Sequence, residues 1–534
     1  MNHLIMEATT SIKTRMAKNK LSWIIRAKHH LSRFSQEGET KQNLKDNNFH
    51  LGVKTRYFAV ITIAVIMLVS IFAVLQTATP TEESHIEPQS TNSSTAIPSP
   101  TNQETPQATA VPSASNPQST PASYPRIWGL ELDFDLRPVG IIESAKKMDS
   151  SVWKEVARQA WQYFQPGVGI DSTTGLPGAV SGWPYFTDWD LGVYIQAIID
   201  AQKMGLVSWE GDWGVAYRFD KVLTFLETRP LNEYDYPFWF YQAGNGQNYQ
   251  SRSDGATGNL DAVDSGRLFV ALNNLRKYSP DYASRIDNIV LQGRSDYTAI
   301  LPEIQSESNK TSLYAYYVWS GFAAFWPDEV GNVSKQILNN IKNSEPVSVN
   351  QQIVLPNGTV VQGNGNVTLP NAEILCEPLL QSVFELNNND NEERTYLENL
   401  SRQVYLAHEE YHNITGEWIA FSEGGSGSGT FIYEWVNLPE LGSWKVTTID
   451  RIHYPMKPII YSKVALSFLA LYNTTYAKNL CIYLEKCLPQ QSTGWSDGAD
   501  FTIEKDNRNI IPNVSCNTNG MILAASRYYI QNNP

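Results

Sequence analysis

The sequence predicts an all-α protein whose folded part is an (α/α)6 toroid, a ring of about six helical hairpins in two concentric layers. Three observations predict this fold. Apolar residues recur at helical spacing through most of the chain after residue 125. Several of these stretches are apolar on more than one face, which favours helices buried in an inner layer. One stretch alternates polar and apolar residues, so β structure is expected only in a small hairpin insertion.

The predicted helices follow one another along the chain. In "WDLGVYIQAIIDAQKMGL", Leu191, Ile195 and Ile198 lie on one apolar stripe. The expected hairpin is "VSVNQQIVLPNGTVVQGNGNVTL", which turns at Asn357-Gly358. The other predicted helices lie near residues 140–164, 217–228, 262–277, 312–326, 372–386, 393–412, 458–472, 476–486 and 517–530.

The N-terminal part of the chain predicts a membrane anchor. Residues 1–56 contain 11 Lys/Arg and 4 Asp/Glu, and residues 57–75 are uncharged and long enough to cross a bilayer as one helix. Because the positively charged side of such a helix stays in the cytoplasm, we expect an uncleaved single-pass signal anchor in the cell membrane. Residues 76–124 are rich in Ser, Thr and Pro and predict a disordered stalk. Residues 125–534 would then form an extracytoplasmic toroid domain.

The charge of the outer part restricts its partners. After residue 57 the chain carries 30 Lys/Arg and 50 Asp/Glu. Such an acidic surface argues against nucleic acid or an anionic membrane surface as the ligand. Neutral or cationic partners remain open, and no cofactor is expected.

Four cysteines lie in the predicted toroid domain, where an outward location permits disulfides. Cys481 and Cys487 are close enough in sequence to close a short loop, which would leave Cys376 to pair with Cys516. Spacing alone does not decide between these pairings and others.

Carboxylates recur where helices are expected to begin. In "TDWD", Thr187 can cap a helix while Asp190 reaches back to the Thr187 amide. In "DAVDSGR", Asp261 and Asp264 repeat this spacing. Helix capping alone would explain both pairs of residues, and Asp188 would complement the positive end of its helix. If the inner helices of a toroid start at the same rim, however, these carboxylates converge in one pit.

Further acids and aromatic residues fit a sugar site. Glu377 lies in "NAEILCEPLL", and Glu423 precedes glycines that allow a ligand to approach the backbone. The chain has 15 Trp and 27 Tyr, and Trp183, Trp189 and Tyr433 lie near the candidate acids. Aromatic faces pack against sugar rings, while carboxylates bind hydroxyls. The alternative is that these rings simply belong to the core.

Several ordered motifs resemble a known family. They are "TDWDLGVYIQAIIDAQKMGL", "LDAVDSGRLFVALNNLR", "EWIAFSEG", "FIYEWV", "YSKVALSFLALYNTTYAKNL" and "NTNGMILAA". From about residue 150 to the end, the chain resembles the bacterial and archaeal family called domain of unknown function 3131. That family is similar to glucoamylase-like and β-1,2-glucanase-like (α/α)6-toroid glycoside hydrolases. The resemblance implies the toroid and a pit at its rim.

The resemblance and the residue types together predict a glycoside hydrolase that acts on a poly- or oligosaccharide. Hydrolysis needs one protonated carboxyl and one ionised carboxylate. We expect Glu377 to be the general acid and Asp264 the base. The expected substrate-binding residues are Asp188, Asp190, Arg267, Glu423, Trp189, Trp183, Tyr433, Lys463 and Asn519.

Two alternatives remain from the sequence. A non-catalytic cell-surface protein could keep the toroid and bind or display glycans, because fold does not determine function. The segment "HEEYH" has the spacing of a zinc metalloprotease helix, with His408 and His412 as ligands and Glu409 as base. No persuasive third ligand follows it, so no metal site is expected.

Overall fold

The structure is a computed structural model that describes residues 150–533, apart from 250–259, 356, 387–389, 427–429, 488–491, 501–508 and 512. The predicted cytoplasmic segment, membrane anchor and stalk lie outside these residues. Within the described ranges, no helix is both long enough and apolar enough to span a bilayer. The anchor therefore stays a prediction.

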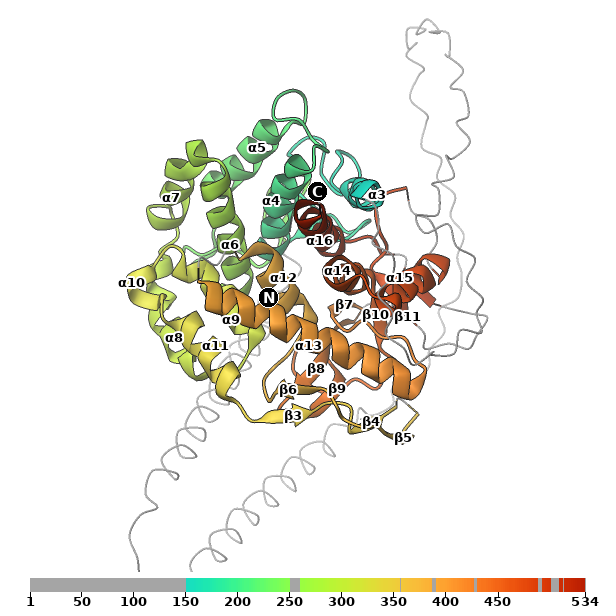
Figure 1. Cartoon of the computed structure of the whole chain (residues 1–534). Helices are drawn as coiled ribbons and strands as arrows, with labels where there is room; N and C mark the ends of the chain where they lie inside the picture. The colour runs from blue at the N-terminus through green and yellow to red at the C-terminus, as the bar shows by residue number, and fades with distance from the viewer. Residues whose placement is uncertain are drawn as a thin grey trace, which may run out of the picture. The chain divides into compact units, whose positions relative to one another are not determined.

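Six helices of the described part form an inner ring (Figure 1). Each inner helix contacts the next inner helix along the chain, and the last inner helix contacts the first, which closes the ring. The inner helices are α4 (Asp188–Lys203), α6 (Ala262–Tyr278), α9 (Leu313–Ala323), α12 (Cys376–Glu385), α14 (Ser462–Tyr472) and α16 (Cys516–Asn532).

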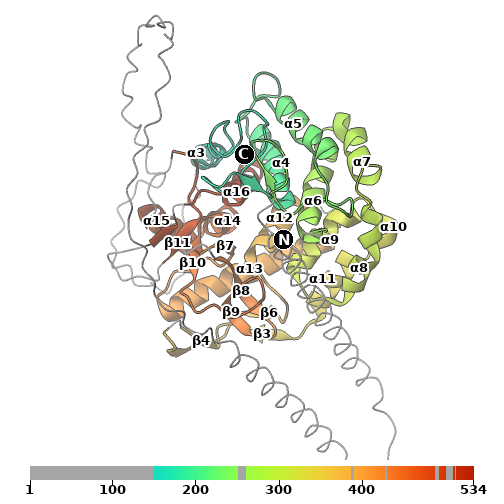
Figure 2. The ribbon, with the colours of Figure 1, turned by 180° about the vertical axis from the view of Figure 1, so that it is seen from behind.

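A second layer of helices surrounds this ring, and each of the longer ones contacts an inner helix (Figure 2). They are α3 (Ser150–Trp161), α5 (Val215–Thr228), α7 (Ala283–Leu291), α11 (Val333–Asn343), α13 (Asn391–Thr415) and α15 (Thr475–Cys487). Shorter helical pieces are η2 (Pro280–Tyr282), η3 (Tyr297–Ile300), α8 (Leu301–Ser306), η4 (Glu307–Asn309) and α10 (Pro327–Val330).

This arrangement agrees with the predicted toroid of helical hairpins. Four helices were not predicted, namely α7, α8, α10 and α11. Helices α8 and α10 are too short to show a helical period, whereas α11 carried a readable signal in Val333, Ile337 and Ile341.

Glycines two positions after the site carboxylates allow the inner helices to approach closely. A Cβ atom at Gly192 of α4 would lie 3.0 Å from the Cα of Leu268 on α6. A Cβ atom at Gly266 of α6 would lie 2.5 Å from the carbonyl oxygen of Val318 on α9. The repeated Asp-x-Gly spacing therefore combines an acid at the rim with close backbone packing about half a turn further along the helix.

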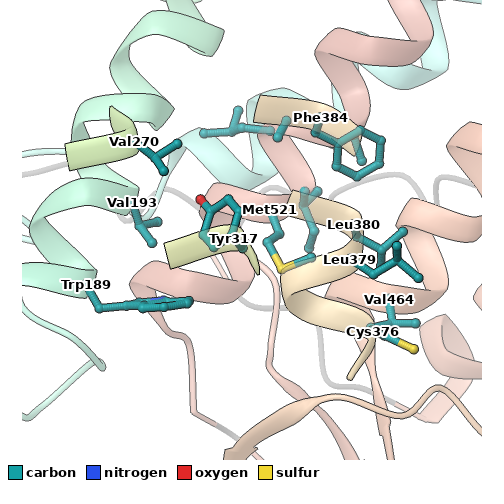
Figure 3. Packing of buried hydrophobic residues seen from close by; sticks show 14 of the residues in the cluster. Trp189, Val193, Val270, Tyr317, Cys376, Leu379, Leu380, Phe384, Val464 and Met521 are labelled. Atoms are coloured by element: carbon teal, nitrogen blue, oxygen red, sulfur yellow. The ribbon is translucent and has the colours of Figure 1, made fainter. Parts of the chain in front are cut away.

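Apolar side chains from all six inner helices fill the ring (Figure 3). Figure 3 shows residues from every inner helix around the same core. They are Trp189 and Val193 on α4, Val270 on α6, Tyr317 on α9, Leu379, Leu380 and Phe384 on α12, Val464 on α14 and Met521 on α16.

The predicted hairpin is confirmed. Strand β4 (Gln352–Val354) pairs antiparallel with β5 (Val360–Gln362), and Gly358 takes a φ of +82° in the turn. Strand β3 (Pro346–Ser348) pairs with β6 (Thr368–Pro370) beside it. Figures 1 and 2 both place β3, β4, β8 and β9 on the side of the ring away from α5.

The expectation that β structure is confined to this insertion is wrong. Strand β8 is buried over most of its length, so its sequence reads as a nearly continuous apolar run without the alternation of a half-buried strand. Residues 459–461, predicted as part of a helix, form β10. The additional strands are β1 (Tyr185–Phe186) with β2 (Tyr241–Gln242); β7 (Glu423–Gly425), β8 (Phe431–Leu438) and β9 (Gly442–Thr447); and β10 (Ile459–Tyr461), β11 (Gly498–Asp500) and β12 (Asn509–Ile511).

Candidate active site

The first turns of the inner helices meet at one rim of the ring. Asp190, Asp264 and Glu377 lie in the first turns of α4, α6 and α12, and Lys463 and Asn517 lie in those of α14 and α16. Helix N-termini carry a partial positive charge, which favours carboxylates there. Local capping therefore places the acids, and the closed ring brings them together.

Glu377 lies at the centre of this cluster and is fully buried. Its carboxylate accepts hydrogen bonds from the ammonium group of Lys463 and from the side-chain amide of Asn517. The Ser422 hydroxyl donates a third bond at 3.3 Å. Both oxygens of Glu377 are therefore occupied by donors, one of them a cation, and neither is free for a ligand.

Glu423 lies beside Glu377 and has the opposite character. Burial raises the pKa of Glu423 well above its usual range, and the charge of Glu377 raises it further. The Tyr314 hydroxyl donates to its Oε1 at 3.3 Å, and Lys463 bonds to its backbone carbonyl at 2.9 Å. Both effects favour the protonated form of Glu423.

Asp190 and Asp264 form a second group around Thr187. Thr187 caps α4 through the predicted capping box, in which its backbone N–H donates to Asp190 at 3.0 Å. Burial raises the pKa of Asp190 to about 6. Burial, followed by the charges of Asp261 and Asp190, raises the pKa of the half-buried Asp264 well above its usual range. The charge of Glu377 also acts on Asp190, so the two groups adjoin.

Three polar atoms of the cluster have no hydrogen-bond partner within the described residues although they are buried. They are Oε2 of Glu423, Oδ1 of Asn517 and the hydroxyl of Tyr461. Tyr461 lies against Gly424, where an added Cβ would come within 3.0 Å of its ring. Because buried polar groups are almost always paired, such a group of atoms indicates a place where a polar ligand or water binds.

Aromatic rings border the acids. Tyr433 on β8 is half-buried, and its pKa is raised by burial and by the charges of Glu423 and Asp264, which places it beside both acid groups. Trp189 is almost fully buried and stacks on Tyr314, with ring centres 5.4 Å apart. Trp183 is half-buried and packs against Tyr185 in a separate aromatic group near β1. Of the three predicted rings, Tyr433 is the best placed to contact a ligand.

Three predicted substrate-binding residues have other contacts. Asp188 forms a buried ion pair with Arg229 and accepts from Ser265, so both its oxygens are occupied. Arg267 is buried and pairs with Glu385 at 3.0 Å. The amide of Asn519 bonds only to the backbone of the 494–515 region within the described residues. These side chains support the fold around the site.

Several residues of the cluster were missed. Asn517 stands two positions before the predicted Asn519, and helical geometry turns these two side chains to opposite faces. The sequence motif contains both and does not tell which one faces the acids. Tyr314 lies in the first turn of a predicted helix, but it was missed because only carboxylates at helix starts were considered. Tyr461 ends a strand that was not predicted.

The zinc alternative conflicts with the contacts of His408. Its Nδ1 bonds to the carbonyl of Val404 at 2.8 Å, and its Nε2 accepts the backbone N–H of Phe421 at 3.2 Å. Burial lowers the pKa of His408 to about 4, so the ring is neutral with no lone pair left for a metal. His412 stacks on Trp418. Within the described ranges, no three His, Cys, Asp or Glu side chains are grouped as a metal site would require.

The expected disulfide between Cys376 and Cys516 is wrong, because both thiols are free. Cys376 begins α12 and contacts His408, whereas Cys516 begins α16 and donates to the Asp190 carbonyl at 3.5 Å. The side chain of Cys487 lies outside the described residues, so its pairing with Cys481 stays a prediction.

Comparison with known proteins places the chain in a family. Residues 155–532 match the family described as "Protein of unknown function (DUF3131)". The chain belongs to the DUF3131 family. The match confirms the resemblance seen in the ordered motifs. No curated protein sequence matches this DUF3131 chain.

Solved structures with a similar fold include a candidate glucoamylase from Bacteroides caccae, at 14% identity over 71% of this chain and 94% of that chain, with a TM-score of 0.47. Endo-β-1,2-glucanase from Chitinophaga pinensis matches at 14% identity over 72% of this chain and 93% of its own, with a TM-score of 0.45. A D-mannose isomerase matches at 9% identity over 72% and 98%, with a TM-score of 0.42. Likenesses at this level do not select a reaction for this DUF3131 protein.

Proposed function

We propose that this protein is a glycoside hydrolase that cleaves a poly- or oligosaccharide by carboxylate acid/base catalysis. The observation that carries the proposal is the cluster of acids with contrasting environments. Glu423 has a raised pKa and a free buried oxygen, whereas the adjacent Glu377 is bound by Lys463 and Asn517. Glycosidic bond cleavage needs such a division between a protonated and an ionised carboxyl.

The roles follow from these environments. Glu423 donates a proton to the leaving glycosidic oxygen, because burial and the charge of Glu377 favour its protonated form. Asp264 is the more exposed of the two carboxyls, so water reaches it, and in its ionised form it accepts a proton from the attacking water. Glu377 positions Glu423 and sets its charge state. This assignment replaces Glu377 by Glu423 as the acid and keeps Asp264 as the base.

The polar atoms without partners would bind the sugar. Oδ1 of Asn517 accepts a sugar hydroxyl, the Tyr461 hydroxyl can donate or accept, and the ring of Tyr433 packs against a pyranose face. A neutral, hydroxyl-rich ligand suits this set better than an anion, because the surrounding charges are mostly negative.

Hydrolysis by the full-length protein in detergent tests the proposal. α- and β-linked glucans, β-1,2-glucan among them, are incubated with the wild type, Glu423→Gln and Asp264→Asn, and reducing ends are measured. We expect a loss of at least about 100-fold in each variant, because each removes a proton-transfer group. Glu303→Gln, an exposed carboxylate on α8, is the matched control and retains activity. Undiminished hydrolysis in both site variants refutes the roles.

The rival function is glycan binding without turnover. It predicts that Glu423→Gln and Asp264→Asn bind oligosaccharide with the affinity of the wild type. It also predicts that neither the wild type nor either variant releases reducing ends. Isothermal titration with the same glucans separates the two functions.

Membrane anchoring is a second part of the proposal, and it rests on the uncharged residues 57–75 and the excess of positive charge before them. We expect the full chain to resist alkaline carbonate extraction from membranes, and we expect protease added outside intact cells to remove the region after residue 125. Release of the chain by carbonate would contradict the anchor.

A further inference from the structure

A line of polar side chains runs down the inner helix α12 beneath the candidate active site. Glu377, Gln381 and Glu385 are spaced four residues apart, so they lie on one face of the helix over two turns. All three are at least nine-tenths buried. An inner helix of a closed ring would normally present apolar residues on such a face.

Arg267 of α6 lies beside this polar line. Its guanidinium forms an ion pair with Glu385 at 3.0 Å, and the Tyr317 hydroxyl donates to the same carboxylate at 2.8 Å. Arg267 also interacts electrostatically with Glu377. Arg267 contacts Glu385, which lies one turn from Gln381 on the same face of α12, and we infer that its guanidinium faces the Gln381 amide.

Four buried polar atoms in this space lack a hydrogen-bond partner within the described ranges. They are Nε and Nη1 of Arg267, and both the nitrogen and the oxygen of the Gln381 amide. Buried groups of this kind are rarely left unpaired in folded proteins. The set contains donors and an acceptor, which water can satisfy together, whereas a halide ion can accept from the donors only.

We propose that ordered water binds between Arg267 and Gln381 and links the Glu385–Arg267 ion pair to Glu377, holding that carboxylate in place beside Glu423. Arg267, Gln381 and Glu385 are then positioning residues that act through Glu377 and do not touch the substrate. The effect on catalysis rests on the proposed function, whereas the bound water does not.

Crystallography of the full chain at high resolution tests the water directly. We expect density for at least one water bonded to both Arg267 and Gln381. Direct pairing of the two side chains, or a dry contact between them, would overturn the inference. Crystals grown in bromide test whether the site binds an anion, since an anomalous peak beside Arg267 would identify an anion site in place of water.

Gln381→Met tests the positioning role, because Met has a similar length and cannot hydrogen-bond strongly. We expect kcat to fall by roughly tenfold or more with KM nearly unchanged, together with a shifted pH profile, because Glu377 is displaced. We also expect a Tm lower by about 2 °C or more. Ser382→Ala is the matched control, since Ser382 is buried on the same helix and bonds only to the Pro378 carbonyl of its own helix within the described residues.

The outcomes separate this inference from the proposed function. A Gln381→Met protein with an unchanged or higher Tm and unchanged kcat would show that the amide is idle in a dry core, which refutes the inference. If the wild type hydrolyses no glycan, the proposed function fails, while the crystallographic water and the Tm of Gln381→Met still decide the presence and structural role of the water.

Discussion

Removal of the Lys463 ammonium group provides the sharpest test of the charge arrangement at the rim. Lys463 and Glu377 form an ion pair in which their side chains are 2% and 0% exposed. Lys463→Met leaves a buried carboxylate with only Asn517 and Ser422 as donors. Breaking a buried pair by removing one partner costs about 3–5 kcal/mol. We therefore expect the free energy of unfolding to fall by about this amount at pH 8.

Urea unfolding of the full-length protein at pH 8, followed by tryptophan fluorescence, measures this difference in free energy. The double variant Glu377→Gln/Lys463→Met removes the stranded charge and should recover part of the stability lost in the single variant at pH 8. A loss below about 1 kcal/mol, or no recovery of stability in the double variant, would refute the assigned ion pair.

Three further predictions test the surrounding structure. Asp190 has a folded pKa of about 6 against an ordinary value of 3.8, so its contribution to the free energy of unfolding should fall by about 3 kcal/mol between pH 3 and 7. Asp190→Asn should remove this pH dependence in urea titrations. Gly266→Ala should lower the free energy of unfolding by about 1–3 kcal/mol or more, because the new Cβ meets the Val318 carbonyl. Gly244→Ala is the control and should change the Tm little, because the nearest atom to its Cβ is 3.7 Å away. Tyr433→Ala should raise KM several-fold through lost ring contact, with a small change in Tm because the ring is half-buried; an unchanged KM would remove Tyr433 from the site.

Much of the helical framework could be predicted from the sequence. The Thr187–Asp190 capping box and the Asp261 cap depend on residues within one helical turn, and both are present. The convergence of Asp190, Asp264 and Glu377 followed from helices that start at a common rim. The strand that carries Tyr433, β8, was not predicted because a strand buried over most of its length lacks the alternating pattern. The strand that carries Glu423, β7, has only three residues and is too short to show one.

The roles of individual polar residues were harder to predict. Arg267 and Asn519 lie in the predicted motifs, yet they bond to Glu385 and to backbone groups. Whether a polar side chain on an inner helix faces a ligand or a neighbouring helix depends on a rotation of the helix that its own sequence does not specify. Glu385 and Gln381 look like ordinary helix residues until the ring closes around them.

The sequence by itself determined where α4 and α6 begin and that Thr187 and Asp261 cap them, because capping depends on neighbours within about one turn. Only the tertiary structure decided which carboxylate pairs with Lys463, 86 positions from Glu377, and which carboxyl has a raised pKa. The physical reason is that a pKa depends on burial and on charges brought close by folding, and both come from helices and strands far apart in the chain.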